Sequence, residues 1–493
     1  MRFSFNWLKR YLRTDLTIAE IADKLTALGL EAEKVEDPAT VFKNFKLVQI
    51  KSAEKHPAAD KLKICVVEDA AGAELSIVCG AKNARVGLKT ILAMPGAVIP
   101  GSGETLKKSK IRGVASEGMM CSASELTISS DSEGIIEIDP NVDLSTSIAD
   151  VLGCDGGSID VSLTPNRGDC FSVKGIARDL AAGGAGEFIA PEKIVCQPSF
   201  KFPINIEYED NKSLRQYAAT FAFRVIRGVK NGESPQWLKT ALKSAGMNGA
   251  SALVDLSNFY MIDSGKPTHL YDAKKIKGDF RIRFAANGEI FQDIKGNEHK
   301  LFSDMLIAAD DESPLCLLGV MGGQRIACDE NTTDILIESA LFNRVWITRT
   351  GTVANITSDA RTRFERGVDL DSSVSGLEEL TKLILENCGG EASDIFVIGE
   401  RPLKGADEIE LTNEIPLRKS RLDSAGGREF DWDEVKLILK KLGLKEIKSG
   451  ENESTFTAPS WRSDLKIEED LIEEVLRIKG YDGVSSKSID IVA

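Results

Sequence analysis

The sequence predicts a multidomain α+β protein, and three observations support this class. The chain has 493 residues, more than one ordinary hydrophobic core holds at roughly 150 residues per domain. Hydrophobic residues make up 42% and charged residues 28%, as in globular rather than disordered or fibrous proteins. The hydrophobic pattern also changes along the chain, from helical to strand-like, then mixed, then helical again.

A capped amphipathic helix is predicted near each end of the chain. In both cases a capping side chain precedes a glutamate by three residues, apolar residues follow at helical spacing, and a glycine ends the helix. The shared positions are Thr17, Glu20 and Gly29 in the first helix and Asp431, Glu434 and Gly443 in the second. We interpret them as an internal repeat of one small helical module, with chance similarity between two ordinary helices as the alternative.

Residues 41–150 predict a small antiparallel barrel with a basic surface. Short apolar runs are separated by Pro, Gly and Asn about every ten residues. Residues 41–121 contain 13 Lys and Arg against 7 Asp and Glu, within a chain of net charge −14. Such a basic stripe suits a phosphate backbone, although a solvated strand face is the alternative on charge alone. The candidate residues are Lys61, Lys63, Lys107, Lys108, Lys110 and Arg112.

Residues 200–400 predict a mixed α+β domain. Strand-like segments at 217–225, 280–284, 305–308 and 334–338 are mixed with helical segments at 234–245 and 376–387. The stretches 190–203 and 399–404, which contain Pro, are the expected linkers on either side.

Several classes of protein are excluded by what the sequence lacks. No apolar run approaches about 18 residues and no secretory signal begins the chain, so membrane spanning and secretion are not expected. The nine cysteines are odd in number and include no C-x-x-C pair, which favours a reducing cytoplasm over a disulfide framework or a zinc site. A phosphate-binding P-loop is absent and the three histidines are far apart, so we expect no ATP site within these residues.

Two residues of the mixed domain have features of an active site. His269, one of only three histidines, lies on a turn-rich segment eleven residues after Asn258, where a side chain can project into a cleft. Glu338 ends an apolar strand, where an ionised carboxylate is costly unless a donor meets it. A carboxylate in that position is suited to bind a hydroxyl, whereas His269 taken alone is more readily explained as a structural histidine.

Carboxylates gather on one face of the helix predicted after residue 464. Asp470, Glu473 and Glu474 stand at helical spacing, and Asp464 precedes them. Oxygen ligands suit Mg²⁺, but on spacing alone an ordinary solvated helix face is the better explanation.

The longer motifs, taken in order, resemble the β subunit of bacterial phenylalanyl-tRNA synthetase. Residues 56–63 and 112–122 are similar to the oligonucleotide-binding (OB) fold tRNA-binding module of several synthetases. The remaining motifs lie at 161–170, 319–323, 337–340 and 363–369. The resemblance covers essentially the whole chain, and in this family the first and fifth modules are similar small helical folds, which agrees with the repeat.

The resemblance implies a domain order. An OB-fold domain at 41–150 is inserted in a split helical B1-like module at 1–40 and 151–190. An editing domain of the B3/B4 type follows at 200–400, and a helical B5-like module at 404–482. The family continues into a catalytic-like and an anticodon-binding domain, so the resemblance presents this chain as an N-terminal portion.

The resemblance also implies a reaction in the mixed domain, the hydrolysis of tyrosine wrongly joined to the phenylalanine tRNA. A hydrophobic pocket rejects an analogue with one extra hydroxyl only about 100-fold, so a second site has to recognise that hydroxyl. In the family pattern Glu338 binds the phenolic hydroxyl, and the other residues hold the backbone, the ester or the attacking water. These are His269, Asn258, Ser257, Gly319, Gly322, Ser358 and Ala360.

For the whole enzyme, the family implies ATP as a substrate in attaching phenylalanine to tRNA, with Mg²⁺ shared between subunits. The implied Mg²⁺ ligands are Asp464, Asp470, Glu473 and Glu474. The implied partners are tRNA and the α subunit of an α2β2 tetramer, with no membrane and no DNA, in the cytoplasm. The isolated chain is then at most an aminoacyl-tRNA deacylase.

Three departures from the family pattern keep a rival interpretation open. Ser251 and Ala252 replace an Asn-Asn pair, Lys266 replaces Gln, and Ser358 replaces Thr. The alternative is a chain that binds tRNA and supports assembly with the α subunit but has lost editing.

Overall fold

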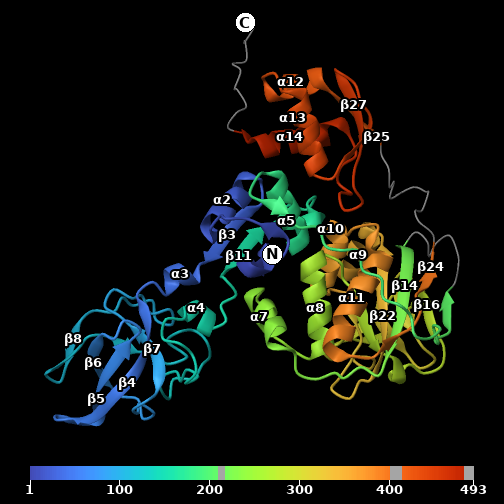
Figure 1. Ribbon diagram of the computed structural model, residues 1–493. Coiled ribbons are helices and arrows are strands. Elements are labelled where there is room, and N and C mark those ends of the chain that lie inside the picture. The colour runs from blue at the N-terminus through green and yellow to red at the C-terminus, as the bar shows by residue number, and fades with distance from the viewer. Residues whose placement is uncertain (209–216, 400–413, 482–493) are drawn as a thin grey trace, which may run out of the picture. The chain divides into compact units, whose positions relative to one another are not determined.

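A computed structural model of the chain describes residues 1–208, 217–399 and 414–481 (Figure 1). The chain divides into two compact units. The first comprises residues 1–3, 7–33 and 160–493, and the second residues 4–6 and 34–159. Both units contain helices and strands, so the predicted mixed α+β class is confirmed. Among the described residues, no helix combines the length and the apolar character required to cross a membrane.

The second unit is built on a five-stranded antiparallel sheet of order β10-β7-β4-β5-β6. Its strands are β4 (Phe45–His56), β5 (Ala59–Asp69), β6 (Glu74–Cys79), β7 (Lys89–Ala93) and β10 (Met119–Met120). Inward side chains such as Val48, Cys65 and Ile77 are fully buried. No strand pairing closes the described sheet into a barrel, although the Glu117 N–H donates to the Ser76 carbonyl at 3.0 Å.

A separate hairpin carries part of the basic segment. Strands β8 (Ser109–Ile111) and β9 (Val114–Ser116) pair as a two-stranded sheet. The two residues between them, Arg112 and Gly113, have φ angles of 47° and 89°. Positive φ at both positions matches the twist of a tight hairpin, so the turn projects Arg112 into solvent. Short helices α3 (Pro38–Val41) and α4 (Ile148–Val151) lie at the two ends of this unit's sequence.

The predicted N-terminal helix is α2 (Ile18–Ala27), and its capping box is present. The Thr17 hydroxyl accepts the N–H of Glu20, and the Glu20 carboxylate accepts the N–H of Thr17. The neighbouring segments also contain strands, so the expected purely helical module is wrong in that respect. The other elements are β1 (Arg2–Ser4), α1 (Phe5–Lys9), β2 (Leu12–Arg13), β3 (Glu31–Glu36), β11 (Ser158–Ser162), α5 (Val173–Ala182) and β12 (Glu187–Phe188).

The mixed domain contains two five-stranded sheets. The first holds β15 (His269–Asp272), β22 (Asp334–Phe342), β14 (Ala218–Arg227), β23 (Glu391–Ala392) and β24 (Phe396–Ile398). The second holds β13 (Ile206–Tyr208), β16 (Phe280–Phe284), β19 (Leu306–Ala309), β20 (Pro314–Leu317) and β21 (Met321–Gly322). A large apolar core includes inward residues of both sheets, such as Phe223 and Ile307.

The helices of the mixed domain are α7 (Gln236–Ser244), α8 (Ala252–Ser264), α9 (Arg344–Val353), α10 (Asp359–Arg366) and α11 (Ser372–Cys388). Helix α11 packs against β14 and β22 of the first sheet, as Figure 1 shows, and α8 contacts β15. A small hairpin of β17 (Ile290–Gln292) and β18 (Glu298–Lys300) completes the domain. The expected linker at 190–203 has no regular structure in the described chain apart from an isolated bridge, and the one at 399–404 lies, after residue 399, outside the described residues.

The C-terminal segment is an α+β module and not the helical one expected. Its strands β25 (Glu414–Arg418), β26 (Lys445–Lys448) and β27 (Glu453–Thr457) form a sheet of order β25-β27-β26. Its helices are α12 (Lys419–Gly426), α13 (Trp432–Lys441) and α14 (Glu468–Lys479). Asp431 caps α13 by accepting two backbone N–H groups. The sheet buries Ile415, Leu417 and Phe456 against the helices. The alternation of buried and exposed residues in these strands is too short to be recognised in the sequence beside the stronger helical patterns.

Candidate active site and nucleic-acid surface

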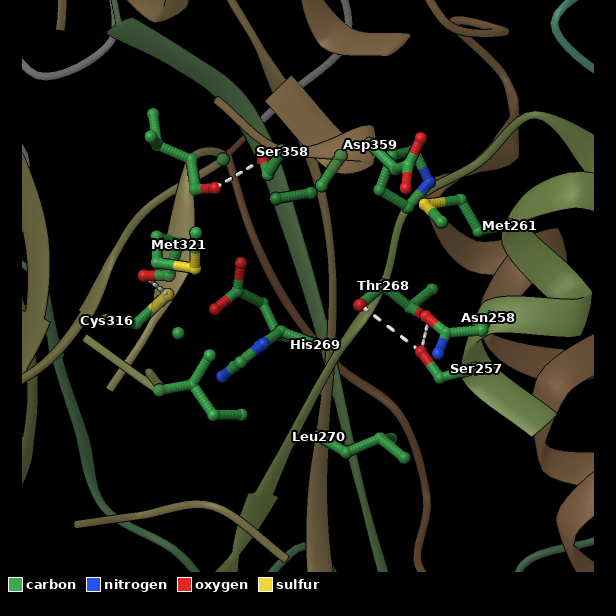
Figure 2. A pocket seen from close by; sticks show the side chains of 18 of the residues that line it. Ser257, Asn258, Met261, Thr268, His269, Leu270, Cys316, Met321, Ser358 and Asp359 are labelled. Carbon is green, nitrogen blue, oxygen red and sulfur yellow. Dashed lines mark hydrogen bonds between the residues drawn. The ribbon is translucent and has the colours of Figure 1, made fainter. Parts of the chain in front are cut away.

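One cavity of the mixed domain is lined by all eight residues that the sequence nominated for hydrolysis. Its volume is about 300 Å³, the lower end of the range for small-molecule sites. The eight are Ser257, Asn258, His269, Gly319, Gly322, Glu338, Ser358 and Ala360. Figure 2 shows Ser257, Asn258 and His269 among the labelled side chains of this cavity.

Helices α8 and α10 and strands β15, β20, β21 and β22 all contribute to the walls. Helix α8 contributes Ser257 and Asn258, and the first turn of α10 contributes Ala360. Strands β15 and β22 pair antiparallel with His269 directly opposite Glu338. Because residues opposite each other in a sheet place their side chains on the same face, the imidazole and the carboxyl are held side by side.

Two glycines make room for these side chains. A side chain at position 322 would collide with the imidazole of His269, and one at 319 would collide with Ile347 and Phe342. Gly319 also has φ of 72°, in the region that favours glycine. The glycines of the 319–323 segment are therefore required by the close approach of the cavity walls.

His269 is buried in a way that keeps it neutral. Its Nε2 atom is buried without a hydrogen-bond partner among the described residues. Burial lowers the pKa of His269 to about 4, because charging the ring in an apolar site is unfavourable. Near pH 7 the imidazole is therefore uncharged and can orient a water molecule or a ribose hydroxyl.

Glu338 is buried with few compensating groups. It is 4% exposed, and the hydroxyl of Tyr271 donates to its Oε2 atom at 2.6 Å. Burial raises the pKa of Glu338 to about 7, although the Tyr271 hydrogen bond and the charge of Lys266 pull it down. Lys266 is itself buried and donates to the Ala340 carbonyl at 2.6 Å. The carboxyl therefore changes charge near neutral pH.

The hydroxyl and amide groups of the cavity differ in how many hydrogen bonds they already make within the protein. Ser358 donates to the Val320 carbonyl at 2.7 Å and accepts the Arg361 N–H as the N-cap of α10, so its hydroxyl has a structural task. Ser257 contacts the Thr268 hydroxyl at 3.2 Å. The Asn258 amide makes no side-chain hydrogen bond within the described part of the chain and remains available to a ligand.

The departures noted in the sequence have different surroundings. Ser251 precedes α8 and accepts a hydrogen bond from Asn231, and Ala252 is buried. Lys266 does not line the cavity, but its positive charge lowers the pKa of Glu338. Such a largely apolar cavity, with the buried carboxyl of Glu338 and the neutral imidazole of His269, can recognise a hydroxyl and hold an ester beside water.

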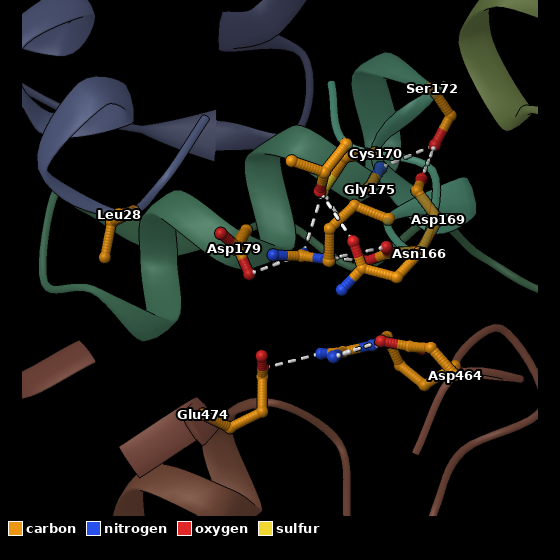
Figure 3. Close-up of polar contacts among 12 residues, drawn as sticks. Leu28, Asn166, Asp169, Cys170, Ser172, Gly175, Asp179, Asp464 and Glu474 are labelled. Atoms are coloured by element: carbon orange, nitrogen blue, oxygen red, sulfur yellow. Dashed lines mark hydrogen bonds and ion pairs between the residues drawn. The ribbon is translucent and has the colours of Figure 1, made fainter. Parts of the chain in front are cut away.

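The four carboxylates predicted as a magnesium site are not brought together. Asp464 accepts two bonds from Arg462, and Glu474 accepts one from the same guanidinium (Figure 3). Glu474 also accepts bonds from Arg477. Asp470 accepts backbone N–H groups at the start of α14, and Glu473 points into solvent. The described residues contain no cluster of three or more metal-ligating side chains. Because arginines already satisfy Asp464 and Glu474, this set does not fit a divalent cation.

Glu474, expected on a face of α14 that meets solvent or a ligand, is instead part of a buried ion network. Glu474 and Arg477 are 3% and 6% exposed. Arg477 also bonds both oxygens of Asp179 on α5, at 2.7 and 2.9 Å. Asp179 also accepts a hydrogen bond from Arg167, and the guanidinium of Arg167 donates a second one to Asp169. The network ties the C-terminal module to the helix α5 that follows the inserted unit in sequence.

The basic residues of the second unit are of two kinds. Lys63 is held by the carbonyls of Ala84 and Lys82, at 2.6 and 3.3 Å. The other five are exposed and make no ion pair with the described residues: Lys61, Lys107, Lys108, Lys110 and Arg112. His56 connects the hairpin of Lys61 to the hairpin of Arg112, since its Nδ1 accepts the Ala58 N–H and its Nε2 donates to the Ile111 carbonyl at 3.2 Å.

Sequence reasoning missed Tyr271 and Lys55, and it noted Lys266 only as a departure from the family pattern. Tyr271 and Lys266, which act on Glu338, belong to the segment that follows α8. Lys55 lies opposite Lys63 in the β4–β5 pairing and is exposed, so it extends the basic surface. The period-two spacing of His269 and Tyr271 could have placed both on one face of a strand. No signal near Tyr271 in the sequence shows that its buried hydroxyl bonds Glu338.

Three family models match successive parts of the chain. The tRNA binding domain matches residues 45–147, the B3/4 domain residues 218–389, and the tRNA synthetase B5 domain residues 415–481. All eight cavity residues fall within the B3/4 match, and the exposed basic residues fall within the tRNA binding match.

Curated relatives match over nearly the whole chain. The phenylalanine–tRNA ligase β subunits of Paramagnetospirillum magneticum and Novosphingobium aromaticivorans are each 44% identical, over 98% and 99% of this chain. The chain spans about 60% of the length of these relatives. A crystal structure of an N-terminal fragment of the phenylalanyl-tRNA synthetase β subunit from Pyrococcus horikoshii is 12% identical with a TM-score of 0.40, covering 97% of this chain and 99% of that one.

Proposed function

Because the chain belongs to the family of phenylalanine–tRNA ligase β subunits, we propose that its mixed domain hydrolyses tyrosine wrongly attached to the phenylalanine tRNA. The basic surface of the second unit holds the tRNA during this reaction. One observation carries the proposal: a single cavity gathers a hydroxyl-binding carboxyl, Glu338, and a neutral imidazole, His269, on facing positions of two paired strands.

Glu338 selects the substrate in this proposal. Its carboxylate accepts a hydrogen bond from the para-hydroxyl of the tyrosyl group, which phenylalanine lacks. A site built to bond a hydroxyl discriminates by more than a purely apolar pocket does. Burial strengthens that bond, because water does not compete for the carboxylate.

The ester end of the substrate lies toward His269 and Asn258. Water adds to the ester carbonyl carbon, the bond from that carbon to the ribose oxygen breaks, and the ribose oxygen takes up a proton. Free tyrosine and intact tRNA are released. His269 and the unbonded Asn258 amide orient the water and the terminal ribose, while Ser358 holds the 319–323 segment through Val320.

The remaining assignments belong to the same proposal. We assign an OB-fold tRNA-binding domain to residues 41–150, within a split module at 1–40 and 151–190. The editing domain is assigned to 200–400 and the B5-like module to 404–482, supported by the ranges of the three family matches. In the whole ligase an α subunit, ATP and Mg²⁺ take part in attaching phenylalanine. The described carboxylates of α14 are not assigned to that metal.

A binding-only function is the second candidate. It is favoured by Ser358, whose hydroxyl is already engaged at both its donor and its acceptor side. In that case the chain binds tRNA and supports assembly without hydrolysing the ester. A deacylation assay separates the two functions.

The experiment compares hydrolysis of two tRNAs, one carrying tyrosine and one carrying alanine. We expect Glu338→Ala to slow release of tyrosine about tenfold to a hundredfold more than release of alanine, since a charge-assisted hydrogen bond is worth roughly 1.5–3 kcal/mol. His269→Ala should slow both, since it acts at the ester end. Glu386→Ala, which removes an exposed carboxylate of α11, is the matched control. No release of tyrosine by the unaltered chain would establish the binding-only function instead.

A further inference from the structure

Tyr271 contacts Glu338 from outside the cavity. Its side chain is fully buried and does not line the cavity. Its hydroxyl donates to Oε2 of Glu338 at 2.6 Å. Oε1 has no hydrogen-bond partner among the described residues, although Glu338 lines the cavity. The two oxygens of one carboxyl are therefore in different situations, one fixed by the protein and one open to a ligand.

The ring of Tyr271 is itself fixed on both sides. It packs edge-on against His269, with ring centroids 4.4 Å apart, and against Phe280 at 5.3 Å. Tyr271 and His269 are two residues apart on β15, so both face the same side of the sheet as Glu338 on β22. One strand thus supplies both the imidazole at the ester end and the group that holds the carboxyl.

We propose that Tyr271 is the residue that positions Glu338 for the phenolic hydroxyl of the substrate, by binding Oε2 so that Oε1 is presented to the cavity. This inference rests on the proposed editing function. A carboxyl group without such an anchor rotates about its terminal torsion, which is broad and roughly two-fold. Anchoring one oxygen before the substrate arrives removes that rotation from the free energy of binding. The protein thereby uses one phenol to orient the acceptor for a second phenol.

The anchor also affects the charge of the acceptor. The titratable or charged groups that face Glu338 are Tyr271 and His269 on β15, Lys266 after α8, and Cys316 on β20. Burial raises the pKa of Tyr271 and of Cys316 well above their ordinary values, and burial lowers the pKa of His269 to about 4. A midpoint near pH 7 in the preference for tyrosine is therefore assigned to Glu338.

The test is Tyr271→Phe, which removes the hydroxyl and keeps the ring. We expect the ratio of the tyrosine to the alanine release rate to fall about tenfold at pH 7.5, the loss of one hydrogen bond to a charged group. The midpoint of this ratio against pH should also move upward, because the Tyr271 hydrogen bond lowers the pKa of Glu338. Using a ratio cancels any loss of folded protein, so a merely structural role of Tyr271 leaves both quantities unchanged.

Tyr260→Phe is the matched control. Tyr260 is a second buried tyrosine of the same domain, on α8, and it does not line the cavity or contact Glu338. Its removal should leave the ratio and the midpoint as in the unaltered chain. If Tyr271→Phe behaves like Tyr260→Phe while Glu338→Ala remains selective, the inference about Tyr271 is overturned and the editing function stands. If the unaltered chain releases no tyrosine, both are overturned.

Discussion

Two glutamates of this chain are buried to the same degree and have opposite surroundings. Glu338 in the mixed domain is 4% exposed, and Glu474 in the C-terminal module is 3% exposed. Glu338 receives one neutral hydroxyl at 2.6 Å. Glu474 lies between the guanidinium groups of Arg462 and Arg477, at 2.6 and 2.8 Å.

The pKa values of the two glutamates are shifted in opposite directions. Burial raises the pKa of Glu338 to about 7, and its single hydroxyl donor does not cancel that effect. Burial alone would also raise the pKa of Glu474, but the charges of Arg462 and Arg477 hold it well below its usual range. A carboxylate whose charge is met by the protein indicates a structural role, whereas one left short of donors indicates a site kept for a ligand.

The largest expected effect is on the structural side of the comparison. Glu474→Gln leaves two buried guanidinium groups short of a negative partner, which costs about 3 kcal/mol by analogy with other broken buried ion pairs. We expect the urea midpoint of the C-terminal module to fall accordingly. Tryptophan fluorescence is a suitable probe, because Trp432 and Trp461 belong to that module.

The control for this variant is the neighbouring Glu473→Gln. Glu473 is exposed on the same helix, and an exposed carboxylate contributes little to stability. Equal midpoints for the two variants would mean that the network around Glu474 contributes nothing, and the structural interpretation of α14 would fail. The stability that Glu474 contributes should be present above pH 4.5 and be lost only as the pH falls toward its lowered pKa.

The second prediction concerns Glu338 and has the reverse sign. In the unfolded chain Glu338 loses its proton near its ordinary pKa of 4.5, but in the folded chain only near 7. The stability of the folded state therefore declines as the pH rises through this interval. Glu338→Gln removes the charge, and we expect it to stabilise the protein on the order of 2–3 kcal/mol at pH 8.

The same variant should be indistinguishable from the unaltered chain at pH 4, where both side chains are neutral. Urea unfolding at the two pH values measures the difference. A variant that is less stable than the unaltered chain at pH 8 would place Glu338 with Glu474 among the structural carboxylates. Gain of stability together with loss of tyrosine selectivity is the expected trade-off at a binding site.

How far the sequence could predict these two environments depends on how local their causes are. The strand predicted at 280–284 coincides with β16, and the capping box of α2 is present, because both follow from neighbouring residues. Helical spacing predicted one carboxylate face with Asp470, Glu473 and Glu474. It could not show that Glu474 is buried, since Glu474 is held by Arg477, whose other partner Asp179 is 298 residues from it in sequence. Nor could it show that Tyr271 meets Glu338, a contact between strands 67 residues apart.

The cavity itself was predictable in composition but not in chemistry. The family resemblance nominated eight residues, and all eight are among those that line the cavity. The neutral state of His269 and the engaged hydroxyl of Ser358 depend on packing that the motifs do not encode. The C-terminal sheet was missed because its short strands alternate over too few residues beside stronger helical signals.

The smallest expected effect extends the comparison from carboxylates to cations. Lys63 donates hydrogen bonds to two backbone carbonyls, as Glu474 accepts them from its two arginines. Lys108 is exposed and makes no ion pair with the described residues, so its charge, like that of Glu338, is not met by an oppositely charged group in an ion pair. If this surface binds tRNA, only the unsatisfied cation should release counterions on binding. Lys108→Ala should reduce the slope of log affinity against log salt by about one unit, while Lys63→Ala leaves the slope nearly unchanged. If the salt dependence has the same slope for both variants, Lys108 does not belong to the tRNA surface. If only Lys63→Ala reduces the slope, then a lysine that is hydrogen-bonded within the protein can still bind tRNA, and the comparison between structural and binding cations fails.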